Sequence, residues 1–122
     1  MKRSSIAHFP PEIEALDAFD GPFDAFRLAA NGCQVLFATY PAGTSIAPHS
    51  HISNNVGVIT KGQLSLVING TQEVFGVGQW YHVPAGIEHG ASFDEDSAEI
   101  EFWFDGSRIV QPVEPVAKPR CP

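Results

Sequence analysis

The clearest pattern along the chain is a series of short runs in which hydrophobic and polar residues alternate, separated by turn-forming residues. Alternation with a period of two is typical of β-strands that bury one face. Asn31-Gly32 and Asn69-Gly70 each join two such runs, and they predict hairpins because both central residues of a type I′ turn need positive φ. The predicted strands are Phe23–Ala29, Cys33–Tyr40, Asn55–Thr60, Leu64–Ile68, Glu73–Phe75, Trp80–Val83, Gly90–Phe93 and Ala98–Phe104.

Short strands without a long amphipathic helix predict an all-β fold with antiparallel strands, arranged as a barrel or a sandwich. They define one barrel domain over residues 23–106. In the N-terminal arm, 1–22, the chain after Pro10-Pro11 could form one helical turn or stay extended. The C-terminal tail, 107–122, has prolines at positions 112, 115, 119 and 122 and therefore cannot continue a strand ladder.

Composition narrows the class of protein further. With 122 residues, 43% of them hydrophobic and 17% charged, the chain is expected to fold as one globular domain. The formal net charge is −7 and the seven basic residues are scattered, which argues against nucleic acid and anionic membranes as partners. Cys33 and Cys121 do not form a CxxC pair, and no apolar run is long enough for a signal peptide or a transmembrane helix. A cytoplasmic location is the resulting expectation.

Three histidines are the candidate metal-binding residues. His49 and His51 are two residues apart, so on one strand their imidazoles would face the same side. His89 follows the turn Pro84-Ala85-Gly86, which could bring its strand back beside the first pair. Three neutral imidazoles suit Zn, Fe, Cu or Ni better than Mg or Ca. The alternative is a chance pair of histidines on an exposed strand.

The spacing of these residues resembles the two motifs of the cupin superfamily. The first motif is matched by Gly43, His49, His51, Asn55 and Gly62. The second motif is matched by Gly78, Pro84, Gly86 and His89, with Phe93 at the position of its final Asn. This resemblance implies a double-stranded β-helix, or jelly-roll barrel, with His49, His51 and His89 as metal ligands, usually in a homodimer.

The main departure from the family is Asn55, which stands where cupins carry a carboxylate that completes the metal site. A three-His centre resembles those of cysteine dioxygenase and acetylacetone dioxygenase, which hold iron. Asn55 could then bind the metal weakly through its oxygen, hydrogen-bond a metal-bound water, or bond the substrate. The alternative is a barrel that has lost the metal and binds an organic ligand alone.

Further candidates lie on the predicted strands. Glu99, Glu101 and Trp103 alternate with three apolar residues, and if they face the barrel, Glu101 could replace the missing acid or contact the substrate. Tyr40 and Tyr81 could offer hydroxyls to a ligand. Phe37, Ile59, Leu66 and His82 are expected in the barrel wall, and Glu88 is expected at the solvated rim.

Two functions remain open at this point. One is a metal-dependent enzyme, like a dioxygenase, isomerase or lyase, with one divalent transition metal per chain (Fe, Mn, Ni or Zn) and a small organic substrate. The other is a non-catalytic module that binds or senses a small ligand. A homodimer is expected because both ends carry apolar side chains that need a place to bury. They are Phe9, Ile13, Leu16, Phe19, Ile109, Val110, Val113 and Val116.

Overall fold

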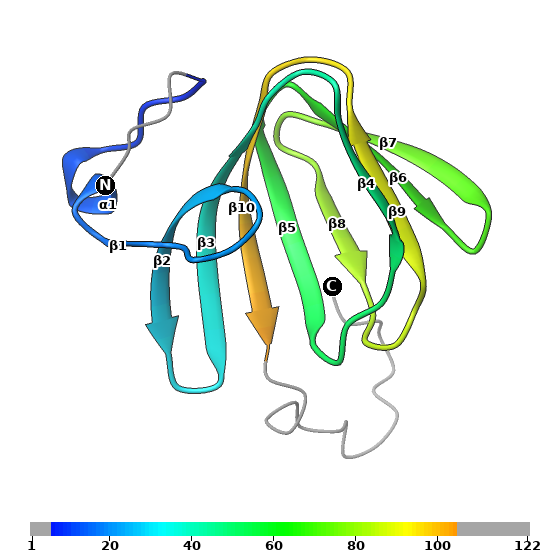
Figure 1. The fold of residues 1–122 in the computed structure, drawn as a ribbon, viewed down its shortest axis with the longest axis horizontal. Coiled ribbons are helices and arrows are strands. Elements are labelled where there is room, and N and C mark those ends of the chain that lie inside the picture. The colour runs from blue at the N-terminus through cyan, green and yellow to red at the C-terminus, as the bar shows by residue number, and fades with distance from the viewer. Residues whose placement is uncertain (1–5, 105–122) are drawn as a thin grey trace.

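The computed structural model describes residues 6–104, and in this part of the chain the strands form two antiparallel sheets that face each other (Figure 1). A short helix, α1 (Pro11–Glu14), precedes the strands. The strands are β1 (Asp17–Ala18), β2 (Asp24–Ala30), β3 (Cys33–Tyr40), β4 (Thr44–His49), β5 (Asn54–Lys61), β6 (Gln63–Ile68), β7 (Thr71–Gly76), β8 (Trp80–Val83), β9 (His89–Phe93) and β10 (Ser97–Phe104).

The strand order confirms the double-stranded β-helix. One sheet has the order β1-β2-β3-β10-β5-β8 and the other β4-β9-β6-β7. From β3 onward the chain therefore passes back and forth between the sheets, and only β6 and β7 follow each other within one sheet. The C-terminal tail 107–122 and the predicted domain boundary at 106 lie outside the described residues.

Every predicted strand is present, and the structure adds two that the pattern did not indicate, β1 and β4. β4 was missed because its sequence, TSIAPH, has little alternation and contains Pro48. A proline is tolerated there because β4 is the edge strand of its sheet and pairs only with β9. At the N-terminus the helical alternative is the one observed, with Pro11 in the first turn of α1.

The two Asn-Gly sites both form hairpins but not the same turn. Asn69 and Gly70 have φ of 51° and 80°, as a type I′ turn requires. Gly32 has φ of 83°, but Asn31 is not among the residues with positive φ. The prediction of a type I′ turn there was wrong, although Ala30 and Cys33 still pair across it.

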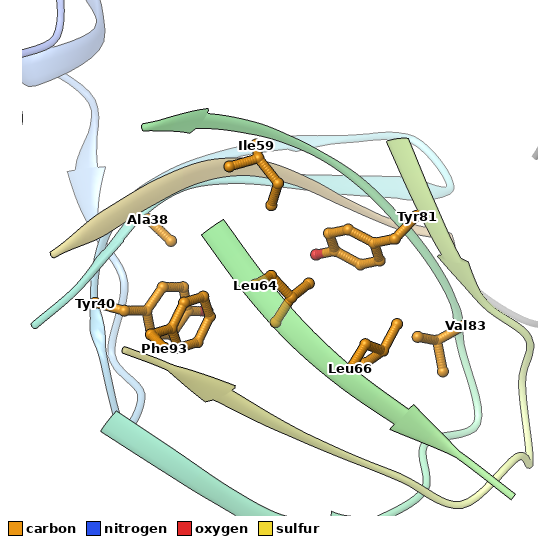
Figure 2. Close-up of a cluster of buried hydrophobic side chains, with 8 residues drawn as sticks. All are labelled: Ala38, Tyr40, Ile59, Leu64, Leu66, Tyr81, Val83 and Phe93. Carbon is orange, nitrogen blue, oxygen red and sulfur yellow. The ribbon is translucent and has the colours of Figure 1, made fainter. Parts of the chain in front are cut away.

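The core lies between the two sheets (Figure 2). On β3 the inward residues are the even-numbered ones, so Leu36 and Tyr40 are only 2% and 3% exposed. Tyr40 stacks on Phe93 of β9, with ring centroids 4.2 Å apart, and this contact joins the two sheets. Burial of each such side chain contributes roughly 1.5–3 kcal/mol. Ile59 and Leu66 are buried as predicted.

Phe37 does not belong to the wall of the barrel. It alternates with the inward residues of β3 and so lies on the outer face of the sheet. There its ring contacts that of Phe9, with the two ring centroids 5.9 Å apart. Phe9 also contacts Phe26, at 6.1 Å between centroids. The wall prediction failed because both faces of β3 are apolar, so composition could not distinguish them.

On β10 the polar set faces inward. Glu99 pairs with Ala38 and Glu101 with Leu36, two buried residues of β3, and directly paired residues share a face. Glu99 and Glu101 are accordingly 3% and 2% exposed. The apolar set of β10 lies on the outer face. None of the helices formed by the described residues has the length and apolar character needed to cross a membrane.

Candidate functional site

The three predicted histidines meet at the end of the second sheet. His49 is the last residue of β4 and His89 the first of β9, and the two are direct partners in the ladder. The ring centroids are 4.4 Å apart for His49 and His89, 4.6 Å for His49 and His51, and 4.7 Å for His51 and His89. One ring nitrogen of each lies within 4.8 Å of the others. The predicted convergence is therefore present.

The reason for the convergence differs from the prediction. β4 ends at His49, so His49 and His51 do not share a strand. His51 lies in the connection to β5, where its carbonyl oxygen accepts a hydrogen bond from the Gly86 N–H at 2.7 Å. Gly86 has φ of 80°, which L-residues rarely adopt. The turn before His89 thus positions the backbone of His51.

Hydrogen bonds to the backbone fix the ring orientation of His49 and His89. Nδ1 of His49 donates to the Ala47 carbonyl oxygen at 2.9 Å, and Nδ1 of His89 donates to that of Ile87 at 3.0 Å. With the proton on Nδ1, Nε2 carries a lone pair, and such backbone contacts commonly orient metal-ligating histidines. Nε2 of His49 lies 2.8 Å from Nε2 of His51, so both point into the same space.

The environment of His51 keeps its ring neutral. Burial, followed by repulsion from His89 and His49, lowers its pKa to about 4. Trp103 covers one side of the imidazole, with centroids 4.6 Å apart in an edge-on arrangement. A neutral imidazole is the form that binds metal, so His51 is available as a ligand at neutral pH.

The donor set fits a transition metal. The three histidines differ in exposure: His49 is exposed, His51 half-buried and His89 buried. Among the described residues no Asp, Glu or Cys joins this group. Three imidazole nitrogens suit borderline ions such as Zn, Fe and Ni rather than Ca or Mg, and three protein ligands leave coordination positions open.

The three-His group lies on a partly open cavity of about 390 Å³. This volume is in the range of small-molecule sites, which are roughly 300–1,000 Å³. The cavity walls are mainly apolar and include Leu36, Ile46, Leu64, Leu66, Val83 and Phe93. Phe19 and Pro22 also line it, a contribution from the N-terminal arm that the alternation pattern did not indicate, next to Phe23 of the barrel domain.

The other predicted site residues also line this cavity. Asn55 is 4% exposed, its Nδ2 donates to the Phe102 carbonyl oxygen at 3.4 Å, and its amide also bonds the Tyr81 hydroxyl. Glu101 accepts hydrogen bonds from the Tyr40 hydroxyl and, at 3.0 Å, from Trp103 Nε1. Glu101 is therefore bound to its neighbours and lies outside the three-His group.

Several side chains differ from their predicted roles. His82 is exposed, because on β8 the inward positions are Tyr81 and Val83, so its assignment to the wall was wrong. Glu88 is exposed, as predicted. Glu99, which the sequence indicated only as one member of an alternating set, is buried and lines the cavity.

Comparisons with known proteins agree with this architecture. A family model described as "Cupin domain" matches residues 36–108. No curated protein sequence matches the chain.

Solved structures with the same fold are numerous. KdgF from Halomonas sp. is 20% identical with a TM-score of 0.67, and the match covers 75% of this chain and 90% of that one. An RmlC-like cupin from Shewanella frigidimarina is 20% identical with a TM-score of 0.68, covering 88% and 97%. A protein of unknown function from Streptococcus pyogenes, SPY1581, is 17% identical with a TM-score of 0.64, covering 81% and 88%.

Identities this low support the fold alone. The family match is stronger evidence, because it spans more than half of the chain and includes all three histidines. The protein therefore belongs to the cupin superfamily.

Proposed function

We propose that this cupin is a metal-dependent enzyme that acts on a small organic molecule, with one divalent transition metal per chain held by His49, His51 and His89. The observation that carries the proposal is the position of the group: three imidazoles converge on the wall of a largely apolar cavity. A closed structural metal site would have no use for such a cavity.

Each part of the site has a distinct role in this proposal. A metal ion of the Fe, Mn, Ni or Zn type would supply Lewis acidity or oxygen activation, as in dioxygenase-, isomerase- or lyase-like reactions. His49 and His89 hold it through Nε2, oriented by their backbone hydrogen bonds. The apolar walls bind the substrate and exclude water. Asn55 binds the metal through its oxygen or bonds the substrate, and Tyr40, Tyr81 and Glu101 contact the substrate.

The first test is metal content. Protein purified without a chelating column after growth in metal-supplemented medium should contain close to one transition-metal ion per chain. His49→Ala and His89→Ala should each lower this content at least about tenfold, because two imidazoles hold an ion much less tightly than three. His82→Ala is the matched control, since His82 is exposed and outside the group, and it should retain the metal.

A wild-type protein that binds no metal under these conditions would contradict the enzyme proposal. It would favour the other function, a metal-free cupin that binds or senses a small ligand in the same cavity.

A further inference from the structure

Two carboxyl groups line the cavity besides the three histidines. Glu99 and Glu101 occupy successive inward positions of β10, and both are almost completely buried. Acidic side chains are rarely buried without a partner of opposite charge. Among the described residues that line the cavity there is no Lys or Arg. The two carboxyls therefore depend on hydrogen bonds alone.

Glu101 has those hydrogen bonds. The Tyr40 hydroxyl donates to Oε2 and Trp103 Nε1 donates to Oε1, so each carboxyl oxygen accepts from a neutral donor. Such a set stabilises the ionised form. The direct contact with Glu99 adds a further hydrogen bond. Burial raises the pKa of Glu101 as well, but these hydrogen bonds oppose that shift, so Glu101 is the more acidic member of the pair.

Glu99 is less completely satisfied. Its carboxyl group bonds the Tyr81 hydroxyl and Glu101, but its Oε1 is buried without a hydrogen-bond partner. Burial, and then the charge of Glu101, raise the pKa of Glu99 well above its usual value. A buried acceptor left unpaired is unfavourable, which makes it a place where an additional donor would be bound.

We propose that Glu99 and Glu101 form a second polar site in the cavity, which binds a hydrogen-bond-donating group of the organic ligand. The donor is a hydroxyl or a protonated amine, since the site offers one unpaired acceptor and a second carboxyl group, with no Lys or Arg among the described residues that line the cavity. The rest of the ligand is apolar, because Leu36, Leu64 and Phe93 line the same cavity.

This inference deepens the proposed function. It rests on that function for one point, that the other end of the ligand meets the three histidines. The carboxyl pair and the three histidines line the same cavity, so a donor held at Glu99 would fix how the molecule is presented to the histidines. The acid pair would then select which small molecules are bound, by requiring one polar donor.

Binding of two matched probes tests the proposal without knowledge of the natural ligand. Cyclohexanol and methoxycyclohexane have the same ring, but only cyclohexanol can donate a hydrogen bond. Their dissociation constants would be measured by NMR titration on the full chain, once metal-loaded and once after chelation. We expect cyclohexanol to bind about tenfold more tightly in both states, as a hydrogen bond to a buried acceptor commonly provides.

The variants locate the effect. Glu99→Met replaces the carboxyl with an unbranched apolar chain of similar length, and it should reduce the preference for cyclohexanol to less than twofold. Glu73→Gln, a change at an exposed carboxylate on β7, should retain the preference. If Glu99→Met does not fold, Glu101→Gln, which removes the more acidic carboxyl group of the pair, replaces it and should also reduce the preference. Cyclohexylamine distinguishes the two donors: binding tighter than that of cyclohexanol, lost in Glu101→Gln, would identify the ligand group as an ammonium.

Equal affinities for cyclohexanol and methoxycyclohexane, a preference that persists in Glu99→Met, or no detectable binding of either donor probe would overturn the proposal. Its failure is distinguishable from that of the metal site. Loss of metal in His49→Ala should leave the probe preference intact, and Glu99→Met should keep the metal content of the wild type.

Discussion

Asn55 is the residue at which this chain departs most clearly from the cupin motif, and its amide is buried against Tyr81 and the Phe102 carbonyl. If the amide weakens metal binding because it lacks a charge, Asn55→Glu should bind Mn, Ni or Zn about tenfold more tightly. Competition with a chelator at fixed pH measures this affinity. Asn55→Gln has the same added length without the charge and should show no gain. Unchanged binding in Asn55→Glu would mean that Asn55 is not a metal ligand.

Glu99 allows a prediction about stability and pH. Because burial and the neighbouring Glu101 raise its pKa in the folded state, the folded protein keeps a proton that the unfolded chain releases above its ordinary pKa of 4.5. The contribution of Glu99 to the free energy of unfolding is therefore fully present below that pKa. It is lost as pH rises toward the pKa of the folded state, by about 1.4 kcal/mol per pH unit. Glu99→Gln removes this loss. The variant should be more stable than the wild type at pH 7 in denaturant unfolding, and the difference should shrink toward pH 4. A difference in stability that is constant with pH would contradict the raised pKa of Glu99.

At the level of the elements, the tight connection between β5 and β6 joins the two sheets through Gly62. Gly62 has φ of 72°, and an added Cβ would lie 2.3 Å from Ser97 Oγ and 2.5 Å from the Asp96 carbonyl oxygen. Ser97 Oγ in turn accepts from the Gln63 N–H at 3.1 Å, which ties β10 to the start of β6. A side chain here would separate these two strands.

Gly62→Ala should therefore destabilise the protein by about 3 kcal/mol, from the positive φ and the clash together. Gly70→Ala is the matched control, because Gly70 has φ of 80° but nothing within 4 Å of an added Cβ. It should cost only about 1 kcal/mol. Thermal and denaturant unfolding measure both, and equal losses in the two variants would show that the clash is relieved by movement of Ser97.

For the whole molecule, we propose a homodimer formed through the outer face of the six-stranded sheet. The apolar residues that share this face include Val56, Val58, Ile100 and Phe102, which pair with one another across β5 and β10. Trp80 extends the face onto β8 with its side chain 52% exposed.

Light scattering should give a mass near twice 13.2 kDa. Trp80→Glu should weaken the dimer about thirtyfold, the effect of a central aromatic contact. Val74→Glu, at an exposed position on the other sheet, should leave it intact.

The N-terminal arm was expected to take part in this contact. Its Phe9 packs against Phe26 and Phe37 of the same chain, so this residue buries its ring on its own barrel. Deletion of residues 1–18 should lower thermal stability, because it uncovers both rings. A dimer that survives the deletion would leave pairing through the sheet standing and exclude the arm, and a monomeric intact chain would refute the dimer.

Local pattern was sufficient for eight of the ten strands that the described residues form, with bounds within two residues of those observed, and for the identity of the three histidines. Alternation with period two reports which residues can share a face, and the spacing of glycines and histidines in the cupin motifs reports where the turns and ligands fall. Both signals are contained in short stretches of chain. For this reason the hairpin at Asn69-Gly70 and the convergence of His49, His51 and His89 could be predicted without coordinates.

Only the tertiary structure decided which face of each strand is inside. β3 and β10 each carry side chains on both faces that would be acceptable in a wall, so the pattern could not reject Phe37 or choose between Glu101 and Phe102. The register against neighbouring strands makes that choice, and it depends on contacts between residues far apart in sequence. The edge strand β4 and the buried pair of Glu99 and Glu101 followed from the same long-range pairing, because burial of a polar side chain is tolerated only where distant residues supply its hydrogen bonds.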